Sequence, residues 1–167
     1  MKLANWMLLL ALMQIHPSEV KAQEAFVPDE TFDTFLQRFE DAQTRFVNGD
    51  PTAWIQMAAK DDSVTIFGAF GGYEQGWVEV GPRYEWAAAQ YRSSGAKKSI
   101  EYLSKYADDS IAYTVTIERD QVRTTERTET EPRALRATQV FRRVDGEWRL
   151  VHRHADPLLS WHAPARE

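Results

Sequence analysis

The sequence predicts a single α+β domain in which a strongly bent sheet, antiparallel or mixed, is wrapped by about three helices into a cone. Three observations support this fold class. Apolar residues recur at helical spacing in the first half of the chain, whereas the second half consists of alternating, β-branched runs separated by turn residues. The length of 167 residues and the hydrophobic content of 43% are those of one domain with its own core.

The first half of the chain predicts helices. Apolar residues recur every three or four positions from Phe32 to Phe46, with charged residues on the opposite side, which is typical of an amphipathic helix. Asn48-Gly49-Asp50-Pro51 ends this helix, and the proline suits the first position of a short second helix that includes Trp54. Helical spacing returns from Trp77 to Tyr91, which predicts a third helix.

The remaining segments predict strands. Ser63 to Phe67 is a short β-branched run, and the glycine-rich stretch from Gly71 to Trp77 predicts a movable flap over a pocket. Four longer runs follow, over residues 98–107, 110–122, 134–144 and 147–156. Asp145-Gly146, a strong signal for a two-residue hairpin turn, joins the last two. Phe141 marks the inward face of the third run, whereas either face of the second run suits a core.

The N-terminal residues have the three-part layout of a secretory signal. Lys2 precedes a mostly apolar stretch from Leu3 to Ile15, and Val20-Lys21-Ala22 offers small residues for cleavage after Ala22. We therefore expect a signal peptide over 1–22, a single domain over 23–167, and a secreted or periplasmic location. The apolar stretch is too short to span a bilayer, so no stable membrane insertion is expected after cleavage. The alternative is a hydrophobic helix packed on the domain or on a partner.

Composition excludes several classes of function. The chain has no cysteine, which excludes disulfides, thiolate metal sites and cysteine nucleophiles. The net charge of -5 argues against nucleic-acid binding, which needs a basic surface. No nucleotide-binding, zincin or Gly-x-Ser-x-Gly motif is present, so neither a cofactor nor a metal is expected.

Two segments carry a family resemblance. The run Phe46-Val47-Asn48-Gly49-Asp50 and the C-terminal run Val140–Asp156 resemble the SnoaL-like branch of the nuclear transport factor 2-like superfamily, whose fold is cystatin-like. The C-terminal run is also similar to the end of the association domain of calmodulin-dependent kinase II. The resemblance covers residues 29–158. The superfamily includes ketosteroid isomerases, polyketide cyclases, dehydratases and non-catalytic assembly domains, so the fold that it implies does not choose a function.

The candidate catalytic residues are His152, His154 and Glu74. Alternation along the last run places both histidines on the face of Trp148 and Leu150, and this apolar pair predicts that the face looks inward. An imidazole near the open end of the cone could act as a general base, with Glu74 of the flap as a partner. The alternatives are a structural histidine beside one at the rim, a solvent-exposed Glu74, or a His-x-His metal site with Asp156 or a distant glutamate as its third ligand.

Aromatic and amide side chains form the expected pocket wall. The expected ligand-binding residues are Trp54, Phe70, Tyr73, Trp77, Trp86, Gln139 and Phe141. Ordinary core packing is the alternative for most of the aromatic ones. Gln139 stands where the kinase association domain has an arginine, so the anion binding of that domain does not carry over at this position.

Three functions remain open. The first is an exported, homodimeric domain that binds a small-molecule ligand in an aromatic-lined pocket. The second is a cofactor-independent isomerase, cyclase or dehydratase that uses a histidine base. The third is a non-catalytic dimerisation or assembly module that associates through the outer face of its sheet.

Overall fold

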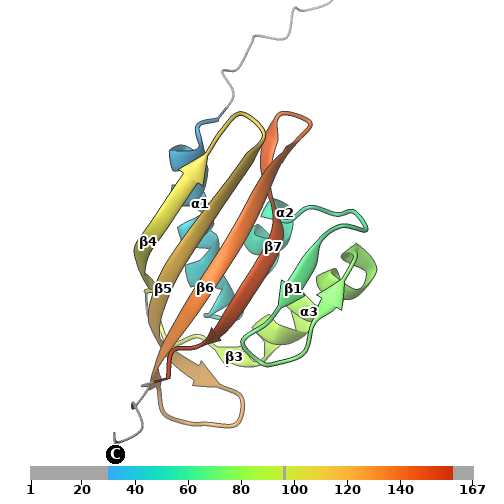
Figure 1. Ribbon diagram of the computed structural model, residues 1–167. Helices are drawn as coiled ribbons and strands as arrows, with labels where there is room; N and C mark the ends of the chain where they lie inside the picture. The colour runs from blue at the N-terminus through green and yellow to red at the C-terminus, as the bar shows by residue number, and fades with distance from the viewer. Residues whose placement is uncertain (1–29, 96, 160–167) are drawn as a thin grey trace, which may run out of the picture.

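The computed structural model describes residues 30–95 and 97–159, so the predicted signal peptide over 1–22 and its cleavage site lie outside the described residues. Within that part, three helices and a seven-stranded sheet form (Figure 1). The helices are α1 (Phe32–Phe46), α2 (Thr52–Met57) and α3 (Trp77–Ala89). The strands are β1 (Thr65–Phe67), β2 (Glu74–Gln75), β3 (Tyr91–Arg92), β4 (Ser99–Ala107), β5 (Ile111–Thr124), β6 (Glu131–Val144) and β7 (Glu147–Pro157).

The sheet is mixed and curls around the helices. Its strands run in the order β2-β1-β7-β6-β5-β3, and β4 also pairs with β5. β1 is parallel to β7, whereas the other strand pairs are antiparallel. α1 lies behind the long strands and α3 lies beside β1 (Figure 1). The predicted fold class, a bent sheet wrapped by about three helices, is confirmed.

Two boundaries differ from the sequence-based prediction. α3 ends at Ala89, because Tyr91 leaves the helix and pairs with Thr124 of β5. Glu74 and Gln75 form a short strand against β1, so the predicted flap is anchored to the sheet at its second half. Both differences come from hydrogen bonds to strands that are distant in sequence, which local spacing does not report.

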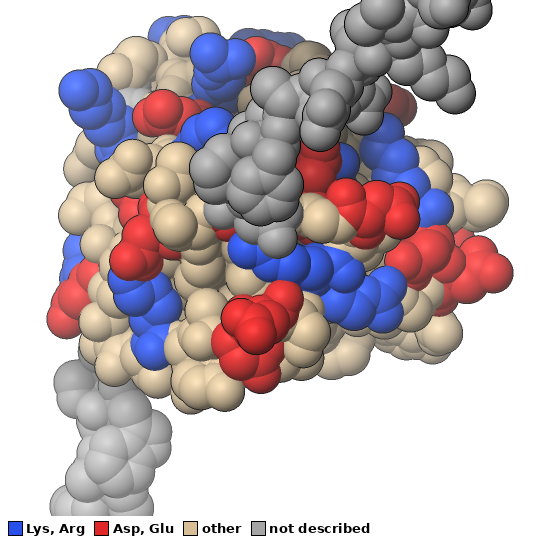
Figure 2. Space-filling view, turned by 90° about the horizontal axis from the view of Figure 1, so that it is seen from above, with Lys and Arg blue, Asp and Glu red and all other residues tan. Residues whose placement is uncertain are grey.

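Acidic and basic side chains are intermixed on the end of the molecule that is seen from above (Figure 2). Surface ion pairs join charged residues from different elements, such as Arg142 with Asp61 at 2.9 Å. The absence of a nucleic-acid partner stays a prediction from the net charge. No helix within 30–95 and 97–159 is long and apolar enough to cross a membrane.

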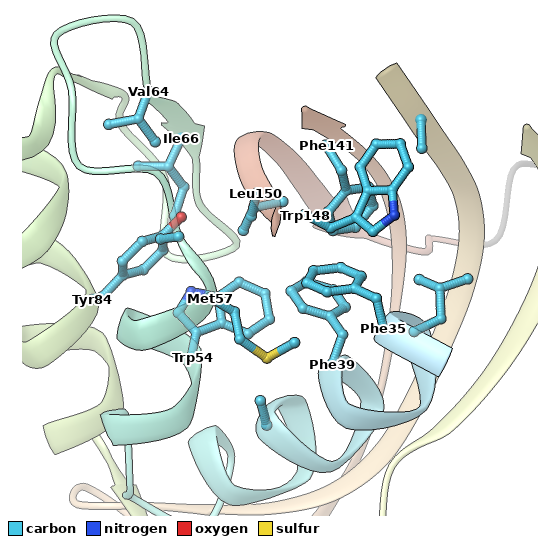
Figure 3. Close-up of a cluster of buried hydrophobic side chains, with 14 of the residues drawn as sticks. Phe35, Phe39, Trp54, Met57, Val64, Ile66, Tyr84, Phe141, Trp148 and Leu150 are labelled. Atoms are coloured by element: carbon cyan, nitrogen blue, oxygen red, sulfur yellow. The ribbon is translucent and has the colours of Figure 1, made fainter. Parts of the chain in front are cut away.

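α1 supplies one wall of the core. It begins at a capping residue, Thr31, whose hydroxyl accepts a hydrogen bond from the Thr34 amide at 3.2 Å. The helix packs Phe35 and Phe39 against Phe141 of β6, with ring centroids 5.4 and 5.0 Å apart in edge-to-face contacts (Figure 3). Burial of each phenylalanine contributes about 1.5–3 kcal/mol, so this aromatic cluster holds α1 against the inner face of the sheet.

β5 turns its polar side chains inward and its apolar side chains outward. Thr114, Thr116 and Glu118 are buried, whereas Ile111 and Tyr113 are exposed on the other face. The sequence left the inward face of this strand open, and the structure selects the polar one. Buried polar groups need partners, so this strand must find hydrogen bonds and ion pairs inside the domain.

A β-bulge interrupts the pairing of β6 with β7. Phe141 lies opposite Leu150, but its neighbour Val140 lies opposite His152. Val151 is therefore an extra residue on β7, with no partner of its own on β6. A bulge of this kind reverses which side chains of the strand point to each face.

The bulge overturns the predicted direction of the two histidines. Leu150, before the bulge, is buried as expected, but beyond it the buried residues are Arg153 and Ala155. His152 and His154 point to the outer face instead, where His152 is half-buried and His154 is exposed. The prediction that they share the face of Trp148 and Leu150 is wrong, because strict alternation holds only for an unbroken ladder.

Candidate ligand-binding site

A cavity of about 60 Å³ lies between the helices, the inner faces of β6 and β7, and the loop that follows β1. Its walls are largely aromatic and include Phe46, Trp54, Phe70, Tyr84 and Tyr91. An engineered cavity of about 150 Å³ in another protein is large enough to hold benzene. The present cavity therefore fits a group of a few atoms, and a larger molecule needs one wall to move.

Part of the cavity lining is basic. The lining includes Lys98, which directly precedes β4, Arg133 of β6 and Arg153 of β7. Their carboxylate partners, Glu118 and Asp120, do not line it. A molecule in the cavity would therefore meet the cations directly, with the compensating negative charge behind them.

Glu118 is the centre of the buried charge network. Its two carboxylate oxygens accept hydrogen bonds from both terminal nitrogens of Arg153 at 2.7 Å each. Lys98 Nζ lies 2.6 Å away, and the amide of Gln139 donates a further bond at 3.0 Å. Burial acts to raise the pKa of Glu118, but the charges of Arg153 and Lys98 outweigh it and hold that pKa well below its usual range.

A second ion pair, between Arg133 and Asp120, continues the network. Arg133 donates two hydrogen bonds to Asp120, at 3.0 and 2.7 Å, and also donates to the hydroxyl of Tyr91. Lys98 lies 3.8 Å from Asp120, so its ammonium stands between the two carboxylates. Burial raises the pKa of Tyr91, and the phenol therefore stays neutral beside the guanidinium.

Two buried donors at the cavity lack a hydrogen bond within the described residues. The hydroxyl of Tyr84 and the indole nitrogen of Trp54 are both buried in the wall, near one another but outside hydrogen-bonding geometry. Burial raises the pKa of Tyr84 to about 12, so the hydroxyl keeps its proton. A buried unpaired donor costs about 1–3 kcal/mol, which an incoming acceptor would recover.

The titratable lining of the cavity is cationic and phenolic. In the part of the chain that the structure describes, no histidine and no carboxylate lines the cavity, and Lys98 is the lining amine that could act as a base in its neutral form. That part of the chain also contains no cluster of ligands that could hold a metal ion. The cavity instead brings together hydrogen-bond donors and cations behind aromatic walls.

The two candidate histidines lie on the outer face, beside Phe67. Nδ1 of His152 is 2.8 Å from the hydroxyl of Thr65, and Nε2 of His154 is 3.2 Å from the carboxylate of Asp156. The ring of Phe67 contacts both imidazoles edge-on, at centroid distances of 5.4 and 5.2 Å. Burial lowers the pKa of His152, and His154 lowers it further.

Glu74 does not contact either histidine. It pairs with Arg83 of α3 at 3.3 Å, and Arg83 lines the cavity and donates to the carbonyl of Gly71 at 2.7 Å. The guanidinium of Arg83 also lies over the ring of Trp86. Glu74 therefore holds the arginine that ties the flap to α3, and it does not orient an imidazole.

Among the predicted wall residues, only Trp54 and Phe70 line the cavity. Gln139 and Phe141 are buried on the inner face as predicted, but they lie behind the cavity, in the charge network and in the aromatic core respectively. The other three predicted residues do not line it either: Tyr73 is 72% exposed, Trp86 contacts the ring of Phe70 edge-to-face, and Trp77 packs against Gly81.

The sequence-based predictions did not include the buried charge network, although two signals in the sequence pointed to it. Thr114, Thr116, Glu118 and Asp120 alternate along one strand and so share one face of it. A row of two threonines and two carboxylates on one face is a signal that this face carries a polar network. Arg133 also shares the face of Phe141 by parity. An arginine and two carboxylates on inward faces of neighbouring strands indicate a buried ion-pair network.

Several solved structures share this fold. A calcium/calmodulin-dependent protein kinase type II association domain-like protein from Thiobacillus denitrificans has a TM-score of 0.58 and 21% identity, over 77% of this chain and 96% of that one. A nuclear transport factor 2-like superfamily protein from Salmonella enterica has a TM-score of 0.61 and 16% identity, over 79% of this chain and 92% of that one. A ketosteroid isomerase-like protein from Erwinia carotovora has a TM-score of 0.62 and 13% identity, over 77% of this chain and 94% of that one. At these identities the likeness concerns the fold alone.

Sequence comparison gives the family. No curated protein matches the chain. The family model of the SnoaL-like domain matches residues 52–159, which include α2, α3 and every strand of the sheet. This agrees with the resemblance that the C-terminal run suggested. The chain therefore belongs to the SnoaL-like domain family, and its fold is that of the nuclear transport factor 2-like proteins.

Proposed function

We propose that this chain is a small-molecule-binding domain whose ligand occupies the cavity between Trp54, Tyr84 and the three cations. The observation that carries the proposal is the convergence of unpaired buried donors and cationic side chains on one aromatic-walled space. Buried polar groups in folded proteins are normally paired. An acceptor group of a ligand would pair them, and its apolar remainder would contact the rings.

The position of Phe70 supports a ligand that extends past this cavity. A second hollow of about 130 Å³ shares Phe70, Tyr91, Arg133 and Leu135 with the first, so these side chains form the wall between the two spaces. Phe70 is 43% exposed and sits on the loop before Gly71, which has a positive φ of 83°. Displacement of the Phe70 ring would open part of the wall between the two spaces.

Tyr84→Phe tests the proposal, because it removes the unpaired hydroxyl and little else. We expect the ligand affinity to fall about 3–10-fold, the value of one hydrogen bond, while the melting temperature is unchanged or higher. Candidate ligands are those that stay bound in native mass spectrometry of protein from its own host. Tyr102→Phe is the matched control. The hydroxyl of Tyr102 donates to Glu40 at a distance of 2.6 Å, and Tyr102 does not line the cavity. Its loss should therefore lower stability and leave the ligand affinity unchanged.

We also propose that two copies associate through the outer face of β4, β5 and β6. Leu103, Tyr106, Ile111 and Tyr113 are exposed there. These are the apolar residues that an alternating strand normally buries, so a second copy of the same face would cover them by a symmetric contact. Arg153, which parity placed on this face, is excluded from it by the bulge.

We further propose export, on the strength of the N-terminal layout alone. Lys2, the apolar stretch Leu3 to Ile15 and Ala22 have the order of a cleavable signal. The mature protein from its own host should begin at Gln23 in N-terminal sequencing. A cytoplasmic protein that retains Met1 would contradict this.

A further inference from the structure

The buried network contains one more positive than negative charge. Within the described residues it joins Lys98, Arg133 and Arg153 to the carboxylates of Glu118 and Asp120. Arg83 also lines the cavity, but Glu74 neutralises it at 3.3 Å. The remaining polar groups at the site, such as Tyr84, are uncharged. An unbalanced buried charge is costly unless it is removed or paired.

Lys98 is the member of the network that can lose its charge. Each carboxylate already has a two-point partner, Arg153 for Glu118 and Arg133 for Asp120, and an arginine does not release its proton in a protein. Lys98 is thus the surplus cation, and its side chain is only 4% exposed. Burial lowers the pKa of Lys98; Glu118 and Asp120 oppose this, whereas Arg153 and Arg133 reinforce it.

We propose that the ligand of this site is a carboxylate monoanion and that Lys98 takes up one proton when the ligand binds. The inference rests on the proposed function, namely that the cavity is a ligand site. Without a ligand, a neutral Lys98 balances the two ion pairs. With a single negative charge in the cavity, the ammonium form restores the balance, and the hydroxyl of Tyr84 and the indole of Trp54 gain an acceptor.

Charge and size favour a carboxylate over a phosphate ester. A phosphate dianion would bring two negative charges against a surplus of one, so the network would be unbalanced in the opposite direction. A carboxylate group also suits a cavity of about 60 Å³, and its two oxygens can accept hydrogen bonds from more than one donor.

Two acids and their amides test the ligand class. Acetate and benzoate are compared with acetamide and benzamide, which have the same shape without the charge, by isothermal titration calorimetry on the mature chain. We expect the acids to bind at least about tenfold more tightly than the amides, as a charge-assisted contact predicts. Equal affinities for acid and amide would overturn the charge assignment and leave the cavity as a ligand site. Absence of binding by all four compounds would count against the proposed function itself.

Proton uptake tests the role of Lys98. Titrations of benzoate from pH 6 to 9, each repeated in two buffers that differ in heat of ionisation and that contain neither phosphate nor carboxylate, give the number of protons taken up from the difference in heat. We expect uptake to rise toward one per site as the pH passes the pKa of Lys98 in the free protein, with affinity falling by about tenfold per pH unit above it. Carboxylate binding without proton uptake over this whole range would overturn the inference.

Lys98→Arg separates charge from titration. The arginine keeps the positive charge but cannot release a proton, so benzoate should bind with no uptake and a flat pH profile. Lys97→Arg, at the exposed neighbouring position, should retain the uptake of the unmodified protein. If Lys98→Arg does not fold, the pH profile of the unmodified protein still decides, because its uptake is measured without any substitution.

Discussion

Arg153 and Glu118 form a two-point ion pair in the interior of the domain, with both nitrogen–oxygen distances at 2.7 Å. Arg153 reaches this position because the bulge at Val151 turns it inward, and Glu118 reaches it because β5 has its polar face inside. The pair connects the two strands that flank β6. Removal of one partner would leave a buried charge without compensation, which is far more costly than loss of an exposed pair.

Glu118→Gln should lower the free energy of unfolding by about 3–5 kcal/mol, because Arg153 and Lys98 would lose their counter-charge in the interior. Urea unfolding followed by circular dichroism measures this. Glu101→Gln is the matched control: its carboxylate pairs with Arg119 at 2.8 Å on the surface, and the loss should be below about 1 kcal/mol. Similar losses for both variants would contradict the central role of Glu118.

Acid should remove the contribution of Glu118. Its folded-state pKa is depressed below the ordinary value of 4.5, so the stabilisation is fully present above that pH. As the pH falls below it, the unfolded chain binds the proton first, and stability declines by about 1.4 kcal/mol per pH unit. Urea midpoints from pH 7 to 3 should show the gap between the unmodified protein and Glu118→Gln narrowing below about pH 4.5. A gap that stays constant would argue against a depressed pKa.

The outer-face histidines should be dispensable for ligand binding. His152→Ala and His154→Ala should leave the affinity for benzoate unchanged, because both imidazoles point away from the cavity. The first should lose about 1 kcal/mol of stability with its bond to Thr65, and the second no more than about 0.5 kcal/mol. Tyr84→Phe in the same assay is the positive control. A histidine variant that weakens binding as much as Tyr84→Phe would restore these residues to the site.

Phe70→Ala should widen the range of ligands by joining the two hollows. We expect the ratio of the affinity for 2-naphthoate to the affinity for benzoate to be about tenfold higher in Phe70→Ala than in the unmodified protein, since one more buried ring contributes about 1.5 kcal/mol. Tyr73→Ala is the control, because that residue lies on the same loop but does not line either space. An unchanged ratio of affinities in Phe70→Ala would show that this ring does not limit ligand size.

Tyr113→Glu should convert a dimer into a monomer. The substitution places a charge in the centre of the exposed apolar face of β5, where a second copy would have to bury it. Light scattering at micromolar concentration should report twice the chain mass for the unmodified protein and the single chain mass for the variant. Val78→Glu, at an apolar residue of α3 that is 85% exposed, should remain dimeric. A monomeric unmodified protein would end the proposal.

Some features of this protein follow from short stretches of its sequence. The spacing of Phe32 to Phe46 was enough to predict α1, because a helix repeats its apolar positions within one segment. Asp145 and Gly146 have positive φ values of 52° and 82°, as a tight hairpin turn of this type requires. The inward direction of Gln139 and Phe141 was also correct, because β6 carries no bulge between Leu135 and Phe141.

The site itself depended on the tertiary structure. Whether Arg153 or His152 faces the interior is set by one unpaired residue, Val151, and an extra residue on a strand exists only relative to the strand that it pairs with. The polar face of β5 turns inward because Arg153, Lys98 and Arg133 arrive there from other strands and other segments to neutralise it. Periodicity determines which side chains share a face only within a helix or within a stretch of strand that no bulge interrupts. The partners across the sheet determine which face is buried, because a charge can leave water only where an opposite charge meets it.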